Sequence, residues 1–144
     1  MAGTLNYVTY DEIEKIKNEK LTDCFVAELD YRDINNEEDY LNKMGEIFRF
    51  PVFEGQTGHS WDGYFDWMTD LSWEYDGEWM DMTRNGYNLI IRGCNKNGYS
   101  KRFDKLLRNI IDSFVYDILP WWDKDVESCV VEGKPKSFNV YLVI

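Results

Sequence analysis

Phe138-Asn139-Val140-Tyr141-Leu142-Val143-Ile144 is the most hydrophobic strand-like segment of the chain. Its β-branched and aromatic side chains favour an extended strand. A strand this apolar normally lies in the middle of a sheet, because both of its faces are covered there. The shorter run Cys129-Val130-Val131, which precedes Gly133, is a candidate to pair with it as a hairpin.

Two more strand-like runs lie earlier in the chain, over Cys24–Leu29 and Tyr87–Ile91. Segments with apolar residues at helical spacing separate the three runs. The first segment follows a cap at Asn35 or Asn36 and carries Tyr40, Leu41, Met44, Ile47 and Phe48 on one face. The second runs from Trp61 to about Trp73, and the third from about Lys101 to Leu119 with Pro120 as the stop. Strands that alternate with helices predict an α/β fold with a small, mostly parallel sheet of three or four strands.

The amino-terminal part predicts a short helix. Thr9-Tyr10-Asp11-Glu12 has the form of a capping box, and Ile13 and Ile16 follow at helical spacing until the pattern ends near Lys20. Further along, the polar residues 74–84 are expected to form a linker. A chain of 144 residues has the size of one domain, so we expect a single domain over residues 1–144.

The chain is strongly acidic, with 27 acidic and 16 basic residues and a formal net charge of -11. This charge disfavours nucleic acids and anionic membranes as partners, because their phosphate groups would be repelled. It favours a basic partner instead. A simpler interpretation, that the charge only keeps the protein soluble, stays open.

Nothing in the sequence predicts export, a metal or a cofactor. Residues 1–10 lack the pattern of a signal peptide, and no apolar run reaches the roughly eighteen residues of a membrane span. Cys24, Cys94 and Cys129 are an odd number without metal or redox spacing, so we interpret them as reduced thiols. We therefore expect a cytoplasmic protein that is monomeric when free.

The helix that begins after Ser60 carries an aspartate stripe, which we define as Asp62, Asp66 and Asp70. The three carboxylates are four residues apart and share one face. Another face carries the apolar residues Trp61, Tyr64, Phe65, Met68 and Leu71. Like charges at this spacing cost about 0.2–0.5 kcal/mol per pair, so helix stability does not account for them. A solvated face of an acidic protein remains the alternative interpretation.

Aromatic residues beside the aspartate stripe favour a binding surface. Trp61, Phe65, Trp67 and Phe53 flank the stripe, and aromatic anchors next to charges are typical of protein interfaces. Trp61 and Phe65 are nevertheless expected to be packed more than exposed. A rigid helix with carboxylates about 6 Å apart can imitate RNA phosphates for arginine, lysine or imidazolium groups.

Two segments carry a family resemblance, Phe50-Pro51-Val52-Phe53-Glu54-Gly55 and Ser60-Trp61-Asp62-Gly63-Tyr64-Phe65-Asp66-Trp67-Met68-Thr69. Together they resemble the signature of the barstar family, in which a proline, an aromatic residue and a glycine precede an aspartate helix. The order of elements from Phe25 to Ile144, strand, helix, helix, strand, helix, strand, is similar as well. The resemblance implies a core over residues 25–144 with residues 1–22 as an amino-terminal extension.

The resemblance implies a non-enzymatic inhibitor that plugs the active site of a basic ribonuclease toxin. Asp62 and Asp66 match the two main inhibitory aspartates of the family, and Phe53 matches an aromatic residue that stacks on the catalytic histidine of the nuclease. Gly63 and Thr69 match further contact positions. The surface that we expect to contact the partner comprises Phe53, Gly55, Ser60, Trp61, Asp62, Gly63, Phe65, Asp66, Thr69 and Asp70.

The sequence also departs from the family pattern. Phe65 replaces a tryptophan, Asp70 replaces a glycine, and Gln56-Thr57-Gly58-His59 lengthens the loop before the helix. The amino-terminal helix and the linkers over residues 74–86 and 120–136 are additions. A further family acid near the start of the third helix has no counterpart at residues 100–102, which are Ser, Lys and Arg.

Two other function classes compete with inhibition. An enzyme would use Asp62 and Asp66 as paired carboxylates, or combine them with His59 around a metal, but carboxylates four apart on one helix stand side by side and do not face each other across a substrate. A binding module for a basic partner that is not a nuclease fits the same residues. The sequence does not separate this second alternative from ribonuclease inhibition.

Overall fold

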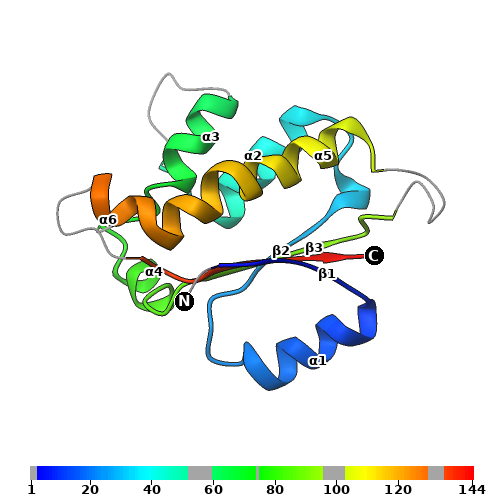
Figure 1. Cartoon of the computed structure of the whole chain (residues 1–144), viewed down its shortest axis with the longest axis horizontal. Helices are drawn as coiled ribbons and strands as arrows, with labels where there is room; N and C mark the ends of the chain where they lie inside the picture. The colour runs from blue at the N-terminus through cyan, green and yellow to red at the C-terminus, as the bar shows by residue number, and fades with distance from the viewer. Residues whose placement is uncertain (1–2, 52–59, 74, 96–102, 130–134) are drawn as a thin grey trace.

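The computed structural model of the protein describes residues 3–51, 60–73, 75–95, 103–129 and 135–144. Its centre is a parallel sheet with the strand order β1-β4-β3-β2. The strands are β1 (Leu5–Val8), β2 (Ala27–Asp30), β3 (Tyr87–Arg92) and β4 (Phe138–Val143). Helices lie on both sides of the sheet, which Figure 1 shows edge-on. The predicted α/β fold is confirmed, and all the strand pairings are parallel.

β4 lies inside the sheet between β1 and β3, as its hydrophobicity predicts. Val140 pairs with Leu5 of β1 on one side and with Leu89 of β3 on the other. Phe138, Val140 and Leu142 belong to the larger hydrophobic core and have no exposed surface. The segment that is costliest to leave in water therefore lies at an inner position of the sheet, next to β3, the other inner strand.

An amino-terminal β–α unit completes the sheet and covers its second face. The edge strand β1 is absent from the sequence-based prediction, whereas the predicted capping box of α1 (Tyr10–Lys20) is present. The Glu12 N–H donates to Thr9 Oγ1 at 3.2 Å, and the Thr9 N–H donates to Glu12 Oε1 at 3.0 Å. α1 lies on the side of the sheet opposite α2, α3 and α5 (Figure 1). There Ile13 packs in a small hydrophobic cluster with Val8, Ile90 and Val143.

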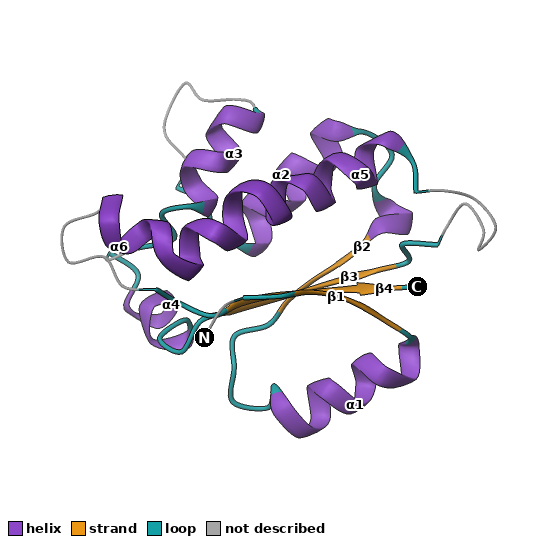
Figure 2. Cartoon of the chain, viewed as in Figure 1, coloured by secondary structure: helices purple, strands orange, loops and turns teal. Residues whose placement is uncertain are grey.

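A layer of helices covers the other face of the sheet (Figure 2). It contains the short 3-10 turn η1 (Tyr31–Asp33), α2 (Glu37–Ile47), α3 (Trp61–Met68) and α5 (Lys105–Asp112). Asn36, and not Asn35, caps α2, because its side chain accepts the N–H of Asp39 at 2.8 Å. Tyr40 and Met44 of α2 and Ile110 of α5 are fully buried between this layer and the sheet.

The last helical run is longer than predicted, because Pro120 does not end it. α5 continues through the π-helical segments η2 (Ser113–Ile118) and η3 (Trp121–Asp125) to α6 (Val126–Cys129). Pro120 has helical φ and ψ of -61° and -34°, and a π-helical neighbourhood relieves the loss of its N–H and the ring clash. Even so, no helix among the described residues is long and apolar enough to cross a membrane.

Two predictions about connecting segments are wrong. Cys129 is helical and not part of a strand, while the rest of the proposed hairpin, residues 130–131, lies outside the described residues. The expected linker over residues 74–84 contains the helix α4 (Gly77–Met82). Asp76 caps α4 by accepting the Trp79 N–H at 3.0 Å, and the Trp79 side chain is fully buried. One buried indole thus fixes a helix too short to show a periodic pattern.

Candidate functional site

The aspartates predicted to bind the partner lie on α3, a helix of two turns. Ser60 caps it as predicted, since its Oγ accepts the Gly63 N–H at 3.0 Å. Tyr64 and Met68 on its inner side are buried. At the other end, the Thr69 hydroxyl donates to the Phe65 carbonyl at 2.7 Å. Both ends of α3 and its inner face are therefore held in place.

The predicted extension of α3 to Trp73 is wrong, because the helix ends at Met68. Leu71 adopts a left-handed φ of 52° and buries its side chain, which turns the chain away from the helix axis. A left-handed φ costs about 1 kcal/mol or more in any residue other than glycine. Here the burial of the Leu71 side chain offsets that cost. Asp70 therefore lies beyond the helix, where its carboxylate accepts the Ser72 hydroxyl. The aspartate stripe has two members on α3 and a third outside it.

Asp62 and Asp66 are exposed and face solvent. Within the described part of the chain, no lysine or arginine forms an ion pair with either carboxylate. Arg49 pairs instead with Asp76 and Glu78 of the α4 region. Asp62 lies in the first turn, where the helix dipole favours a negative charge. Both carboxylates are thus available to cations of another molecule.

Three aromatic rings of α3 pack against one another. The Trp61 and Tyr64 ring centroids are 5.3 Å apart in a T-shaped arrangement, and the Tyr64 and Phe65 centroids are 5.3 Å apart. Trp61 and Phe65 are half-buried, so each packs on the core with one edge and reaches the surface with the other. Trp61 and Phe65 are therefore packed only in part, and part of each side chain is exposed.

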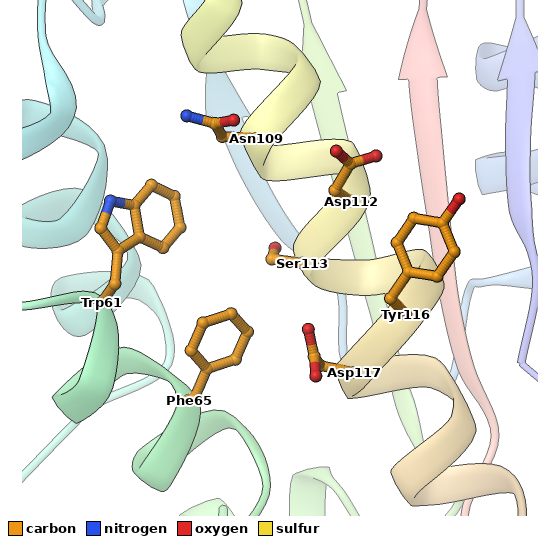
Figure 3. Close-up of a pocket in the computed structure, with 7 residues that line it drawn as sticks. All are labelled: Trp61, Phe65, Asn109, Asp112, Ser113, Tyr116 and Asp117. Atoms are coloured by element: carbon orange, nitrogen blue, oxygen red, sulfur yellow. The ribbon is translucent and has the colours of Figure 1, made fainter.

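A cavity of about 290 Å³ separates α3 from the helix formed by α5 and η2. Figure 3 shows its two sides, with Trp61 and Phe65 on α3 and the remaining side chains on the facing helix. The residues of the facing helix are Asn109, Asp112, Ser113, Tyr116 and Asp117. We call this set the α5–η2 wall. Its two carboxylates are exposed, so the cavity combines aromatic rings with negative charge.

The sequence-based prediction missed the α5–η2 wall. Asp112 and Tyr116 are four residues apart, as Asn109 and Ser113 are, and therefore share a face of the predicted third helix. That spacing is a usable signal, but only the fold shows that this face is turned toward α3. Flat rings beside carboxylates suit a guanidinium group, which can stack on a ring and donate two hydrogen bonds to a carboxylate at once.

Several predicted residues lie outside the described part of the chain. These are Phe53, Gly55 and His59 in the loop before α3, together with residues 100–102 near the third helix. Ser60, Gly63 and Thr69 are described, and all three hold the ends of α3 through backbone contacts. These hydrogen bonds give them a structural role in addition to the predicted role in binding the partner.

The residues of the enzyme alternative are only partly described, because His59 lies outside the described residues. Asp62 and Asp66 do not line the cavity beside α3. Within the described ranges, no group of three His, Cys, Asp or Glu side chains is placed to hold a metal ion. Burial raises the pKa of the Cys94 thiol to about 12, so this thiol stays protonated at neutral pH. Cys24 and Cys129 are exposed.

Comparisons with known proteins identify the family. Neither the curated proteins nor the solved structures gave a match. A family model described as Barstar (barnase inhibitor) matches residues 24–131. The matched range begins just before β2 and contains α2, α3, β3 and the whole last helical run, while β1 and α1 precede it. The chain belongs to the barstar family.

Proposed function

We propose that this protein inhibits a basic ribonuclease by placing α3 in its active site, with Asp62 and Asp66 where RNA phosphates would bind. The family is one of barnase inhibitors, which makes a nuclease of the barnase type the first partner to consider. The observation that carries the proposal is that both carboxylates are exposed and lack an ion pair among the described residues.

The rigidity of α3 supports the same proposal. A phosphate mimic gains affinity when its charges are fixed before binding, because less conformational entropy is lost. Ser60 and Thr69 fix the ends of α3, and Tyr64 and Met68 anchor its inner face. The charged face is therefore presented on a preorganised helix.

The α5–η2 wall extends the proposed surface. Asp112 and Asp117 place two more carboxylates across the cavity from Trp61 and Phe65. A basic active site carries several arginines and lysines, and one of their side chains can enter the cavity while others meet Asp62 and Asp66. The bound surface would then combine a charged helix with an aromatic, acidic cavity.

The experiment is an RNA hydrolysis assay with two nucleases, barnase and the protein encoded beside the gene for this chain. We expect the protein to slow hydrolysis by one of them, and to slow it less as the RNA concentration rises, because substrate and inhibitor compete for one site. Full hydrolysis rates in the presence of a bound protein would instead favour the binding module for a basic partner. Failure to bind either nuclease would contradict the proposal.

A further inference from the structure

Three buried hydroxyl groups connect the helices that carry the proposed site. Tyr40 Oη of α2 lies 2.8 Å from Tyr64 Oη of α3, and Tyr64 Oη lies 2.9 Å from Ser113 Oγ at the start of η2. The Ser113 hydroxyl donates to the Ile110 carbonyl at 2.6 Å. All three side chains are buried, with exposures of 0%, 1% and 3%. We call this set the hydroxyl chain.

The hydrogen bonds of the hydroxyl chain all run in the same direction, from Tyr40 to Tyr64 to Ser113. Ser113 uses its only hydrogen on the Ile110 carbonyl, so Ser113 accepts from Tyr64. Tyr64 has then used its own hydrogen and accepts from Tyr40. Each hydroxyl in the chain thereby has a partner. Burial raises the pKa of the Tyr64 phenol, so the chain keeps its protons throughout the neutral range.

Packing alone does not require these hydroxyl groups. Phenylalanine would fill the positions of Tyr40 and Tyr64 with the same ring, and a buried hydroxyl that loses its partner costs about 1–3 kcal/mol. Ring contacts tolerate small shifts of one helix along another, whereas a hydrogen bond is satisfied over a narrow range of distance and angle. A buried hydroxyl chain therefore selects one placement of α3 among several that would pack.

The link between Tyr64 and Ser113 lies where it can set the width of the cavity. Tyr64 is on α3 between the two exposed aspartates, and its neighbours in sequence and space include Phe65, which lines the cavity. Ser113 is part of the α5–η2 wall (Figure 3). The hydrogen bond at 2.9 Å thus joins the two sides of the cavity directly.

We propose that Tyr64 and Ser113 are positioning residues, whose hydrogen bond fixes α3 against η2 and so sets the spacing between the α3 carboxylates and the α5–η2 wall. This inference rests on the proposed function for its consequence in binding, although the positioning itself is a property of the free protein. A nuclease whose cations match that spacing would bind both acidic surfaces at once. The hydroxyl chain would then help to determine which nuclease is inhibited.

The first test is hydrogen exchange on the free, full-length protein. Tyr64→Phe and Ser113→Ala each remove the link, whereas Tyr40→Phe removes a buried phenol from the same chain but leaves the link intact. In the first two variants we expect the amides of residues 64–68 to exchange about tenfold faster relative to those of β4, as for the loss of one hydrogen bond. Tyr40→Phe removes only the bond from α2 to Tyr64, whereas Tyr64→Phe removes both bonds, so the ratio should rise by less in Tyr40→Phe than in Tyr64→Phe. An unchanged ratio in Tyr64→Phe and Ser113→Ala would overturn the inference.

The second test measures inhibition of barnase by the same three variants. The β4 amides report whether each variant is folded. We expect Tyr64→Phe and Ser113→Ala to inhibit about tenfold more weakly than Tyr40→Phe at matched stability. Faster exchange in α3 without weaker inhibition would show a purely structural hydrogen bond and would overturn the positioning role. If the parent protein does not inhibit barnase, the use of this nuclease as partner fails, and the exchange ratio alone decides whether the link positions α3.

Discussion

Tyr31 Oη donates a 2.6 Å hydrogen bond to Asp104 Oδ1, and the same oxygen accepts the Leu107 N–H at 2.9 Å. Asp104 is the N-cap of α5, and Tyr31 directly follows β2, so one carboxylate joins the sheet to the start of the last helical run. Burial and the neighbouring carboxylate raise the pKa of Tyr31, which keeps the phenol protonated. The acid at the start of this helix is therefore used within the protein, and the acids turned toward α3 lie further along, at Asp112 and Asp117.

Replacing Asp104 should reduce stability without reducing inhibition. Asp104→Ala removes the cap of α5 and the acceptor of Tyr31, so we expect the free energy of unfolding to fall by about 1–2 kcal/mol. Asp104→Asn keeps a capping oxygen and should lose less. Urea unfolding measures both variants. A large loss of nuclease inhibition in folded Asp104→Asn would contradict the internal role of this carboxylate.

The stability of the protein should fall in acid partly through Glu28. Burial opposes ionisation of Glu28, but hydrogen bonds from Lys17 and Arg92 outweigh it and lower its pKa below the ordinary value of 4.5. A lowered folded-state pKa contributes stability that is present above the unfolded value and is lost as the pH falls through the folded value. The difference in unfolding free energy between the parent and Glu28→Gln should therefore be larger at pH 7 than at pH 3.

One outcome of that comparison would contradict the role of Glu28. Urea unfolding at both pH values gives the difference directly, with Glu19→Gln as a control because Glu19 is an exposed acid on α1. A difference for Glu28→Gln that stays constant from pH 7 to pH 3 would show that its ion pairs with Lys17 and Arg92 do not contribute to stability.

Gly86 should be among the least replaceable residues of the sheet. It precedes β3 with a φ of +114°, and a Cβ atom there would overlap the Ser137 carbonyl oxygen. That oxygen accepts the Tyr87 N–H at 2.8 Å, which aligns β3 with β4. We expect Gly86→Ala to lower the unfolding free energy by about 1–3 kcal/mol. Gly77→Ala is the control, because its Cβ would meet no atom within 4 Å, and equal effects of the two changes in thermal unfolding would refute this account.

Association with the nuclease should depend strongly on salt. The formal net charge of -11 attracts a basic partner over long distances, and salt screens this attraction over about 10 Å at 0.1 M. We expect the association rate constant to fall steeply as sodium chloride increases, with a smaller change in the dissociation rate. Stopped-flow fluorescence can follow the reaction. An association rate that does not change with salt would indicate an apolar interface in place of a charged one.

Segments with strong local signals were predicted correctly. The apolar run of β4 predicts an inner strand because such a run must be buried, and the Thr9–Glu12 capping box predicts a helix start because its two hydrogen bonds join residues three apart. The four residues of β1 carry no such signal, since the segment is short and Asn6 interrupts it, and pairing with β4 supplies the structure. Pro120 led to a wrong prediction, namely that the last helix ends there. The helix continues, because π-helical neighbours tolerate a proline that an α-helix would reject.

The candidate site also contains residues that local sequence patterns predict and residues that only the fold brings together. Asp62 and Asp66 share a helix face at a spacing that the sequence displays, and their exposure follows from that face. Asp70 was placed on the same helix because periodicity does not reveal that Leu71 turns the chain. Asp112 and Asp117 join the site through packing of α3 against η2, which depends on residues far apart in the sequence.

The most direct measurement is the inhibition constant against barnase or the nuclease encoded by the neighbouring gene. It compares two double variants that make the same change in net charge. Asp62→Asn with Asp66→Asn changes α3, whereas Asp11→Asn with Glu19→Gln changes exposed acids on α1, across the sheet. We predict that the α3 variant inhibits at least about a thousandfold more weakly, as for truncated charge pairs at buried interfaces, and that the α1 variant stays within about threefold of the parent. Equal losses in the two variants, or undiminished inhibition by the α3 variant, would contradict the assignment of α3 as the inhibitory element.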